Sequence, residues 1–142
     1  MYDQLKTFPH EPRLILEPGR AIVATSVVLV ASVISRVERA GTTWVTLDAG
    51  VYNALYEGLI HQGRTHYLVH SAKSSDGSAP TREVNLAGPT GDSLDIVARN
   101  VRISDEIGVG DRFAFAHAGA YTKVMASAFN GFPVPPLFVL DD

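Results

Sequence analysis

Three short motifs in the chain combine glycine and other small residues with charged or hydroxyl-bearing side chains that could bind a small ligand. The first is Glu17-Pro18-Gly19-Arg20, which follows the apolar run Arg13–Leu16. The pattern predicts a strand, a turn and the start of a helix, so that free backbone N–H groups are offered to a phosphate. Gly19 would allow a close approach, and Arg20 would add charged donors. Taken alone, the tetrapeptide favours a simple turn with a solvated Glu–Arg pair.

The second motif, Gly88–Asp95, is rich in small residues and places Asp92 at the tip of a turn. A carboxylate there could receive a substrate ammonium group, although an Asx-type turn between two strands is favoured for the motif alone. The third motif joins Gly119-Ala120-Tyr121-Thr122 to Phe129-Asn130-Gly131-Phe132. The Tyr121 hydroxyl could donate to a phosphate oxygen, and an aromatic ring could wall an apolar pocket. Core packing with one satisfied hydroxyl is the alternative for this tyrosine.

Short β-branched or aromatic runs separated by glycine-containing turns must position these motifs. Val27–Val37 predicts a strand, with a switch from helix to strand near Ser26, and Asn53–Gln62 predicts a loop or a short helix. Lys73–Thr81 predicts a polar surface loop. The remaining expected strands are Thr42–Asp48, Thr65–Ser71, Glu83–Ala87, Asp95–Ile103, Arg112–His117 and Leu137–Leu140. Strands at this spacing predict a mainly β fold that closes, or nearly closes, into a barrel.

The composition limits the classes of function. The chain has 142 residues, of which 46% are apolar and 19% charged, and it can therefore bury one core. A formal net charge of -3 gives no diffuse attraction to nucleic acid or anionic lipid, so we expect neither as a partner. The apolar stretch Ala21–Ile34 is interrupted by serine and threonine and is too short to span a bilayer.

Cysteine and histidine usage bears on compartment and metal binding. The absence of cysteine excludes disulfides and a thiolate zinc site, and it fits a reducing cytoplasm. His66 and His70 would share one face of a strand but stand about 13 Å apart, which is too far to chelate one ion. We therefore expect no metal site and a cytoplasmic protein.

The order of the motifs is more specific than any one of them. EPGR, DAGVY at Asp48–Tyr52, GPTxDSxD, GAYT and FNGF follow one another along the chain. From about Arg13 to its end, the sequence closely resembles the carboxy-terminal part of the ornithine/diaminopimelate decarboxylases. These are the fold-type III, alanine-racemase-like decarboxylases that depend on pyridoxal 5'-phosphate. The resemblance implies a carboxy-terminal β-barrel domain over 27–142, with a short helix after EPGR. Residues 1–26 would then be a remnant of the last strand and helix of an α/β barrel.

The resemblance also implies roles for individual residues. Glu17 would pair with the pyridine nitrogen, Gly19 and Arg20 would bind the cofactor phosphate, and Tyr121 would contact that phosphate. In the family, the GPTxD loop reaches the active site of the neighbouring subunit. Asp92 would there act as a catalytic and substrate-binding residue that contacts the distal amino group of a diamino acid. Phe129 would line the substrate pocket, and an aspartate at position 92 resembles the ornithine- or lysine-type branch.

Three departures from the family pattern shape the expected function. Gly91 stands where the family has a cysteine that helps protonate the product, and Leu59–Gln62 replaces the Tyr-Asp-His string of ornithine decarboxylases. None of the three lysines, Lys6, Lys73 and Lys123, resembles the Schiff-base lysine, which the family carries on its α/β barrel. We therefore expect a decarboxylase domain for a basic amino acid that is inactive alone. Its expected partners are the missing α/β barrel, as a domain or as a subunit, and further copies in a homo-oligomer. The alternative is a non-catalytic regulatory or interaction relative.

Overall fold

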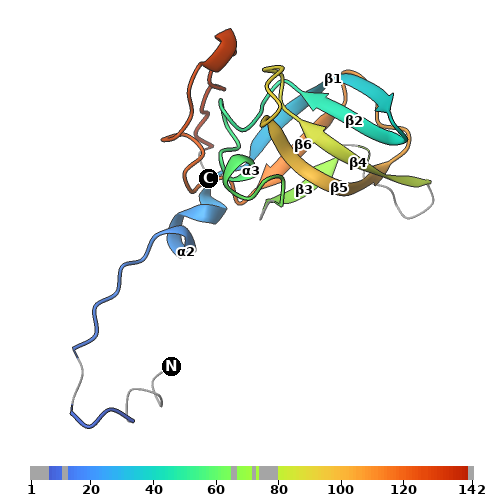
Figure 1. The fold of residues 1–142 in the computed structure, drawn as a ribbon. Coiled ribbons are helices and arrows are strands. Elements are labelled where there is room, and N and C mark those ends of the chain that lie inside the picture. Colours follow the sequence, from blue (N-terminus) through green and yellow to red (C-terminus); the bar gives the residue numbers. More distant parts are fainter. Residues whose placement is uncertain (1–6, 11–12, 65–66, 72, 74–79, 141–142) are drawn as a thin grey trace.

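One curved sheet of six strands curls into a nearly closed barrel (Figure 1). The computed structural model describes residues 7–10, 13–64, 67–71, 73 and 80–140. The strand order is β3-β6-β1-β2-β4-β5, and every neighbouring pair is antiparallel except β2 and β4, which run parallel. The strands are β1 (Leu29–Arg39), β2 (Thr42–Leu47), β3 (Leu68–Ser71), β4 (Thr81–Ala87), β5 (Ile96–Ser104) and β6 (Arg112–Ala116). The expected mainly β, barrel-like fold is confirmed.

The barrel closes around side chains that alternate along each strand, as the pleat requires. In β1, Leu29, Ala31 and Val33 point inward and are buried, while the residues between them are more exposed. Phe113 and Phe115 of β6 are fully buried, and their ring centroids lie 6.4 Å apart. The two edge strands, β3 and β5, both line a cavity of about 110 Å³. Apart from this cavity, buried side chains fill the barrel interior.

Short helical segments flank the barrel (Figure 1). Helix α2 (Arg20–Val23) continues as the 3₁₀-helix η1 (Ala24–Ser26), and the chain becomes extended at Val27. The short helix after EPGR and its switch to a strand near Ser26 are thus confirmed. Helix α3 (Glu57–Ile60) settles the open choice for Asn53–Gln62 in favour of a short helix. A 3₁₀-turn, η2 (Phe129–Gly131), holds the FNGF motif.

Two expected strands are not formed, and both lack a neighbour. Arg13–Leu16 has no regular structure and runs away from the barrel in Figure 1; Leu14, Ile15 and Leu16 are 56–71% exposed. Leu137–Leu140 is likewise irregular, with residues 60–91% exposed. A strand is stabilised by ladder hydrogen bonds to an adjacent strand, and apolar alternation alone supplies none. The expected surface loop at Lys73–Thr81 lies mostly outside the described residues, as does His66.

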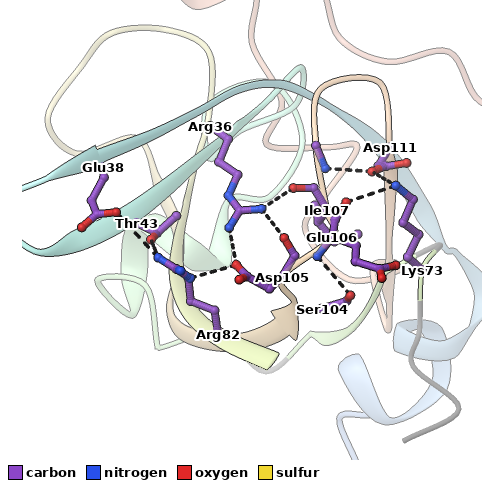
Figure 2. A network of polar contacts seen from close by, with 11 residues as sticks. Arg36, Glu38, Thr43, Lys73, Arg82, Ser104, Asp105, Glu106, Ile107 and Asp111 are labelled. Carbon is purple, nitrogen blue, oxygen red and sulfur yellow. Dashed lines mark hydrogen bonds and ion pairs between the residues drawn. The ribbon is translucent and has the colours of Figure 1, made fainter. Parts of the chain in front are cut away.

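A polar network fixes the segment between β5 and β6 to the rest of the barrel (Figure 2). Arg36 of β1 donates to the carbonyl oxygens of Asp105 and Ile107, both at 2.6 Å, and to the Asp105 carboxylate at 2.5 Å. Arg82 of β4 binds the same carboxylate at 2.9 Å. Lys73 donates to the Glu106 carbonyl at 3.1 Å. One carboxylate thus joins β1 and β4 to the chain that leaves β5.

Acid should weaken this network, and the Asp105→Asn variant should show how much the Asp105 carboxylate contributes to stability. Hydrogen bonding to Arg36, helped by Arg82, holds the pKa of Asp105 below its ordinary value of 3.8. A carboxyl with a lowered folded-state pKa stabilises the fold above its unfolded pKa and loses this effect as pH falls through the folded value. Thermal unfolding should show Asp105→Asn melting below wild type at about pH 7, with the difference narrowing as the pH falls below 3.8 through the lowered folded-state pKa of Asp105.

The matched control is Glu83→Gln, which alters a more exposed ion pair with Arg102 at 3.5 Å. Exposed pairs contribute little to stability, so this variant should melt close to wild type at every pH. An Asp105→Asn deficit that stays constant across the acid range would contradict the expected linkage.

Candidate ligand-binding site

The turn that carries Tyr121 lies directly against the backbone of η1. The Gly119 N–H donates to the Ala24 carbonyl at 2.9 Å, and the Ala118 N–H donates to the Val27 carbonyl at 3.0 Å. A Cβ atom at Gly119 would overlap the Val23 carbonyl oxygen, which is also held by the Ser26 hydroxyl at 2.8 Å. Only glycine allows this approach, which brings α2 and Arg20 next to the tyrosine.

The contact between Gly119 and η1 brings together Arg20 and Tyr121, which are far apart in the sequence. The Arg20 guanidinium carbon lies 5.4 Å from the centroid of the Tyr121 ring, within cation–π range. Tyr121 has a positive φ of 62°, an uncommon conformation for a residue with a side chain. The Arg20 side chain is 43% exposed and Tyr121 is 52% exposed, so both can reach a ligand from outside.

A buried carboxylate lies behind the arginine. Glu57, the first residue of α3, forms an ion pair with Arg20 through Oε1, although its own side chain is only 1% exposed. The backbone N–H of Glu57 donates to the Tyr67 hydroxyl at 3.4 Å. Burial raises the pKa of Tyr67 above 10.0, so this hydroxyl keeps its proton at neutral pH. We call Arg20, Glu57, Tyr67 and Tyr121 the arginine–tyrosine cluster.

Gly19 and Glu17 lie just before this cluster. Gly19 is the N-cap of α2, and its carbonyl oxygen accepts the Ile22 N–H at 2.9 Å. No atom lies within 4 Å of the place where a Cβ of Gly19 would stand, so its surroundings are open. Glu17 is exposed in the irregular segment before the helix. The arrangement offers a part-exposed cation, an exposed tyrosine and open backbone, which are groups that fit a phosphate.

Asp92 and Phe129 belong to a second group of side chains, which is organised by Tyr52. The rings of Tyr52 and Phe129 pack with centroids 4.3 Å apart and an angle of 31°. Burial raises the pKa of the Tyr52 hydroxyl, and the charge of Asp92 and a hydrogen bond to it act in the same direction. Asp92 Oδ1 accepts the Leu94 N–H at 2.7 Å, which gives the expected Asx-type turn. We call Tyr52, Asp92 and Phe129 the aspartate–aromatic cluster.

Asp95 positions this second cluster and is almost wholly buried, at 2% exposed. Its Oδ1 accepts the Val51 N–H at 2.8 Å, and its Oδ2 accepts the Thr90 N–H at 3.1 Å and the Thr90 hydroxyl at 2.6 Å. A Cβ at Gly50 or Gly88 would overlap this carboxylate. The two glycines and Asp95 therefore fix the Gly88–Asp95 loop against the turn that carries Tyr52.

The structure thus brings the sequence-predicted residues together in two groups. Arg20 contacts Tyr121, while Asp92 and Phe129 both contact Tyr52. Within the described part of the chain, no hydrogen bond, ion pair or ring contact joins Arg20 or Tyr121 to Asp92 or Phe129. Sequence reasoning missed Glu57, Tyr67 and the structural role of Asp95. The described residues contain no group of three or more histidine, aspartate or glutamate side chains suited to a metal.

Comparison with known proteins identifies the class that this fold and these motifs define. Residues 2–119 match the family described as pyridoxal-dependent decarboxylase, C-terminal sheet domain. The chain is 32% identical over 126 residues to the lysine/ornithine decarboxylase of Selenomonas ruminantium, and the match covers 89% of this chain and 30% of that protein. It is 37% identical over 122 residues to the diaminopimelate decarboxylase of Zymomonas mobilis, a match that covers 86% of this chain and 27% of the relative.

A solved structure shows the same relationship in three dimensions. The lysine/ornithine decarboxylase of Vibrio vulnificus, complexed with cadaverine, superposes with a TM-score of 0.78 at 32% identity. The match covers 99% of this chain and 37% of that one. The chain therefore belongs to the ornithine/diaminopimelate/arginine decarboxylase family and corresponds to its C-terminal sheet domain. It spans about 30% of the length of the curated relatives that it matches. No helix among the described residues is long and apolar enough to cross a membrane.

Gly119→Ala tests the close contact that brings α2 to Tyr121. The added Cβ must displace backbone, and overpacking of this kind costs about 1–3 kcal/mol. We expect chemical denaturation to show this loss, and we expect the side-chain NMR signals of Arg20 to shift as it leaves the tyrosine ring. Gly108→Ala is the control, because nothing lies within 4 Å of the added atom. Unchanged Arg20 signals in Gly119→Ala would contradict the assigned packing.

The paired variants Asp95→Asn and Asp92→Asn test which aspartate is structural. The first substitution places an amide NH₂ group where a carboxylate oxygen accepts hydrogen bonds, leaving at least one buried donor unpaired at a cost of about 1–3 kcal/mol. Asp92→Asn keeps an oxygen for the Leu94 N–H and should change stability by less than about 0.5 kcal/mol. Equal losses in urea unfolding would show that the two carboxylates share one structural role.

Proposed function

We propose that this chain is the carboxy-terminal domain of a pyridoxal 5'-phosphate-dependent decarboxylase that acts on a basic amino acid of the ornithine or lysine type. The observation that carries the proposal is the contact between Arg20 and Tyr121 at 5.4 Å. Both residues match the phosphate-binding motifs of the family, and the fold brings them together on an exposed site. The catalytic lysine, in this proposal, comes from another segment that carries the α/β barrel.

Each residue then has a distinct task at the cofactor. Arg20 and Tyr121 bind the phosphate, Gly19 leaves backbone open beside it, and Glu17 holds a proton on the pyridine nitrogen. When bound, the cofactor supplies an electron sink for the carbanion left as carbon dioxide departs. A carboxylate next to the ring nitrogen strengthens that sink, because it keeps the nitrogen protonated.

The aspartate–aromatic cluster supplies substrate recognition in this proposal. Asp92 accepts the distal ammonium group of the substrate, and Phe129 lines the pocket for its methylene chain. A carboxylate paired with an ammonium group in a partly apolar site discriminates strongly against substrates that lack the amine. As in the family that the sequence resembles, Asp92 would serve the site of a neighbouring subunit, so the working enzyme is a homo-oligomer. The cysteine-free sequence favours a cytoplasmic enzyme. The resemblance also implies a role in polyamine biosynthesis.

A non-catalytic regulatory or interaction relative is the second candidate, and Gly91 favours it. The glycine has a φ of 74° and nothing lies within 4 Å of an added Cβ. A side chain would have space there, but its backbone would be strained. The group that would protonate the product is therefore missing from the position where the family carries it.

Reconstitution separates the two candidates. The chain is mixed with a barrel polypeptide that carries the lysine, and carbon dioxide release is measured with lysine, ornithine and diaminopimelate. We expect release only from the mixture and only with a basic substrate. Asp92→Asn should raise KM by roughly 10–100-fold, because it removes the negative charge that pairs with the substrate ammonium group. Arg20→Ala should weaken cofactor binding without altering substrate preference.

Glu83→Gln serves as the control variant, because Glu83 belongs to neither cluster. Stable association with the barrel but no cofactor absorbance and no carbon dioxide would contradict the decarboxylase proposal and support the regulatory candidate.

A further inference from the structure

Glu57 is a buried charge at a place where a neutral residue would be less costly. Its side chain is 1% exposed, and burial of an unpaired carboxylate is strongly unfavourable. Oε1 forms an ion pair with Arg20, and neither Oε1 nor Oε2 accepts a hydrogen bond within the described residues. Glu57 therefore depends on Arg20 as its counter-ion, and the ion pair joins α3 to α2 across the edge of the barrel.

The arginine is held on two sides by this arrangement. Its NH1 group meets Glu57, and its guanidinium carbon lies over the Tyr121 ring at 5.4 Å. A guanidinium carries five N–H donors in a rigid planar fork. Because the Arg20 side chain is 43% exposed, donors that are not engaged by the glutamate remain open to solvent. The side chain is thus fixed at its inner edge and available at its outer edge.

We propose that Glu57 is a positioning residue that holds the Arg20 guanidinium ready for a phosphate group, an inference that rests on the proposed function. An arginine side chain loses considerable rotamer freedom when it is immobilised. The buried carboxylate imposes that order during folding, so phosphate binding does not have to supply it. Glu57 itself does not touch the ligand; it acts through Arg20.

Two other roles for Glu57 make different predictions. If Glu57 competes with phosphate for the arginine, its removal strengthens phosphate binding. If the ion pair only links α2 to α3, its removal lowers stability and leaves phosphate binding unchanged. The positioning role alone predicts that the arginine becomes mobile and that phosphate binds more weakly.

The experiment uses this chain with inorganic phosphate as the probe. Wild type, Glu57→Gln, Glu57→Ala and Arg20→Ala are compared by the NMR signal of the Arg20 Nε–H group, by phosphate titration and by melting temperature. Glu83→Gln is the matched control, since it makes the same chemical change in a more exposed Glu–Arg pair. The Arg20 signal reports positioning without any ligand, so the test also works where phosphate binding is weak.

We expect Glu57→Ala to broaden or shift the Arg20 signal and to weaken phosphate binding by up to roughly tenfold, the scale set by the ordering of one rotamer-rich side chain on binding. Glu57→Gln should lose less than Glu57→Ala, because its amide oxygen can still accept from the guanidinium. Glu83→Gln should match wild type. Rescue of phosphate binding by the glutamine would distinguish positioning from simple charge removal.

Tighter or unchanged phosphate binding in Glu57→Ala would overturn the positioning role. If Arg20→Ala still weakens binding in that case, the proposed phosphate site stands and only the role of Glu57 fails. If phosphate binds wild type and Arg20→Ala equally well, or binds neither, the assignment of Arg20 under the proposed function fails as well.

Discussion

The close approach of η1 to Gly119 is the constraint on which the arginine–tyrosine cluster depends. Helix α2 buries none of its own residues, so no apolar face of its own anchors it to the barrel. Its position follows from backbone hydrogen bonds made where a side chain at Gly119 would not fit. Such a contact fixes distance more sharply than apolar packing, because backbone atoms cannot change rotamer. Arg20 then needs only Glu57 and the Tyr121 ring to define its orientation.

The aspartate–aromatic cluster is built on the same principle but with a carboxylate at the contact. Asp95 fills the space that two glycines leave open, and its oxygens accept three hydrogen bonds from Val51 and Thr90. Both of its oxygens are thus engaged inside the fold. Asp92, three residues earlier, is only half-buried and binds one backbone N–H together with Tyr52. Of the two aspartates in this short motif, Asp95 is thus structural, and Asp92 is the one that we propose for substrate recognition.

The barrel could be predicted from the sequence to a large extent, because β-branched alternation reports which face of a strand is buried. The same signal failed at Arg13–Leu16 and Leu137–Leu140, where the apolar runs have no adjacent strand to receive their hydrogen bonds. The proximity of Arg20 to Tyr121 could be expected only from motif order. Glu57 could not be found, because nothing local marks a glutamate as buried when its counter-ion lies in a distant helix.

The distribution of exposed apolar residues agrees with a domain that works beside another one. The polar network around Asp105 satisfies the segment between β5 and β6 within the chain itself, and burial of Phe113 and Phe115 completes the interior. In contrast, Leu14, Ile15 and Leu16 precede the EPGR motif with most of their surface in solvent. Large apolar exposure is unfavourable in isolation. Leu16 directly precedes Glu17 in the chain, so a domain that covered these apolar side chains would adjoin the segment proposed to bind the cofactor.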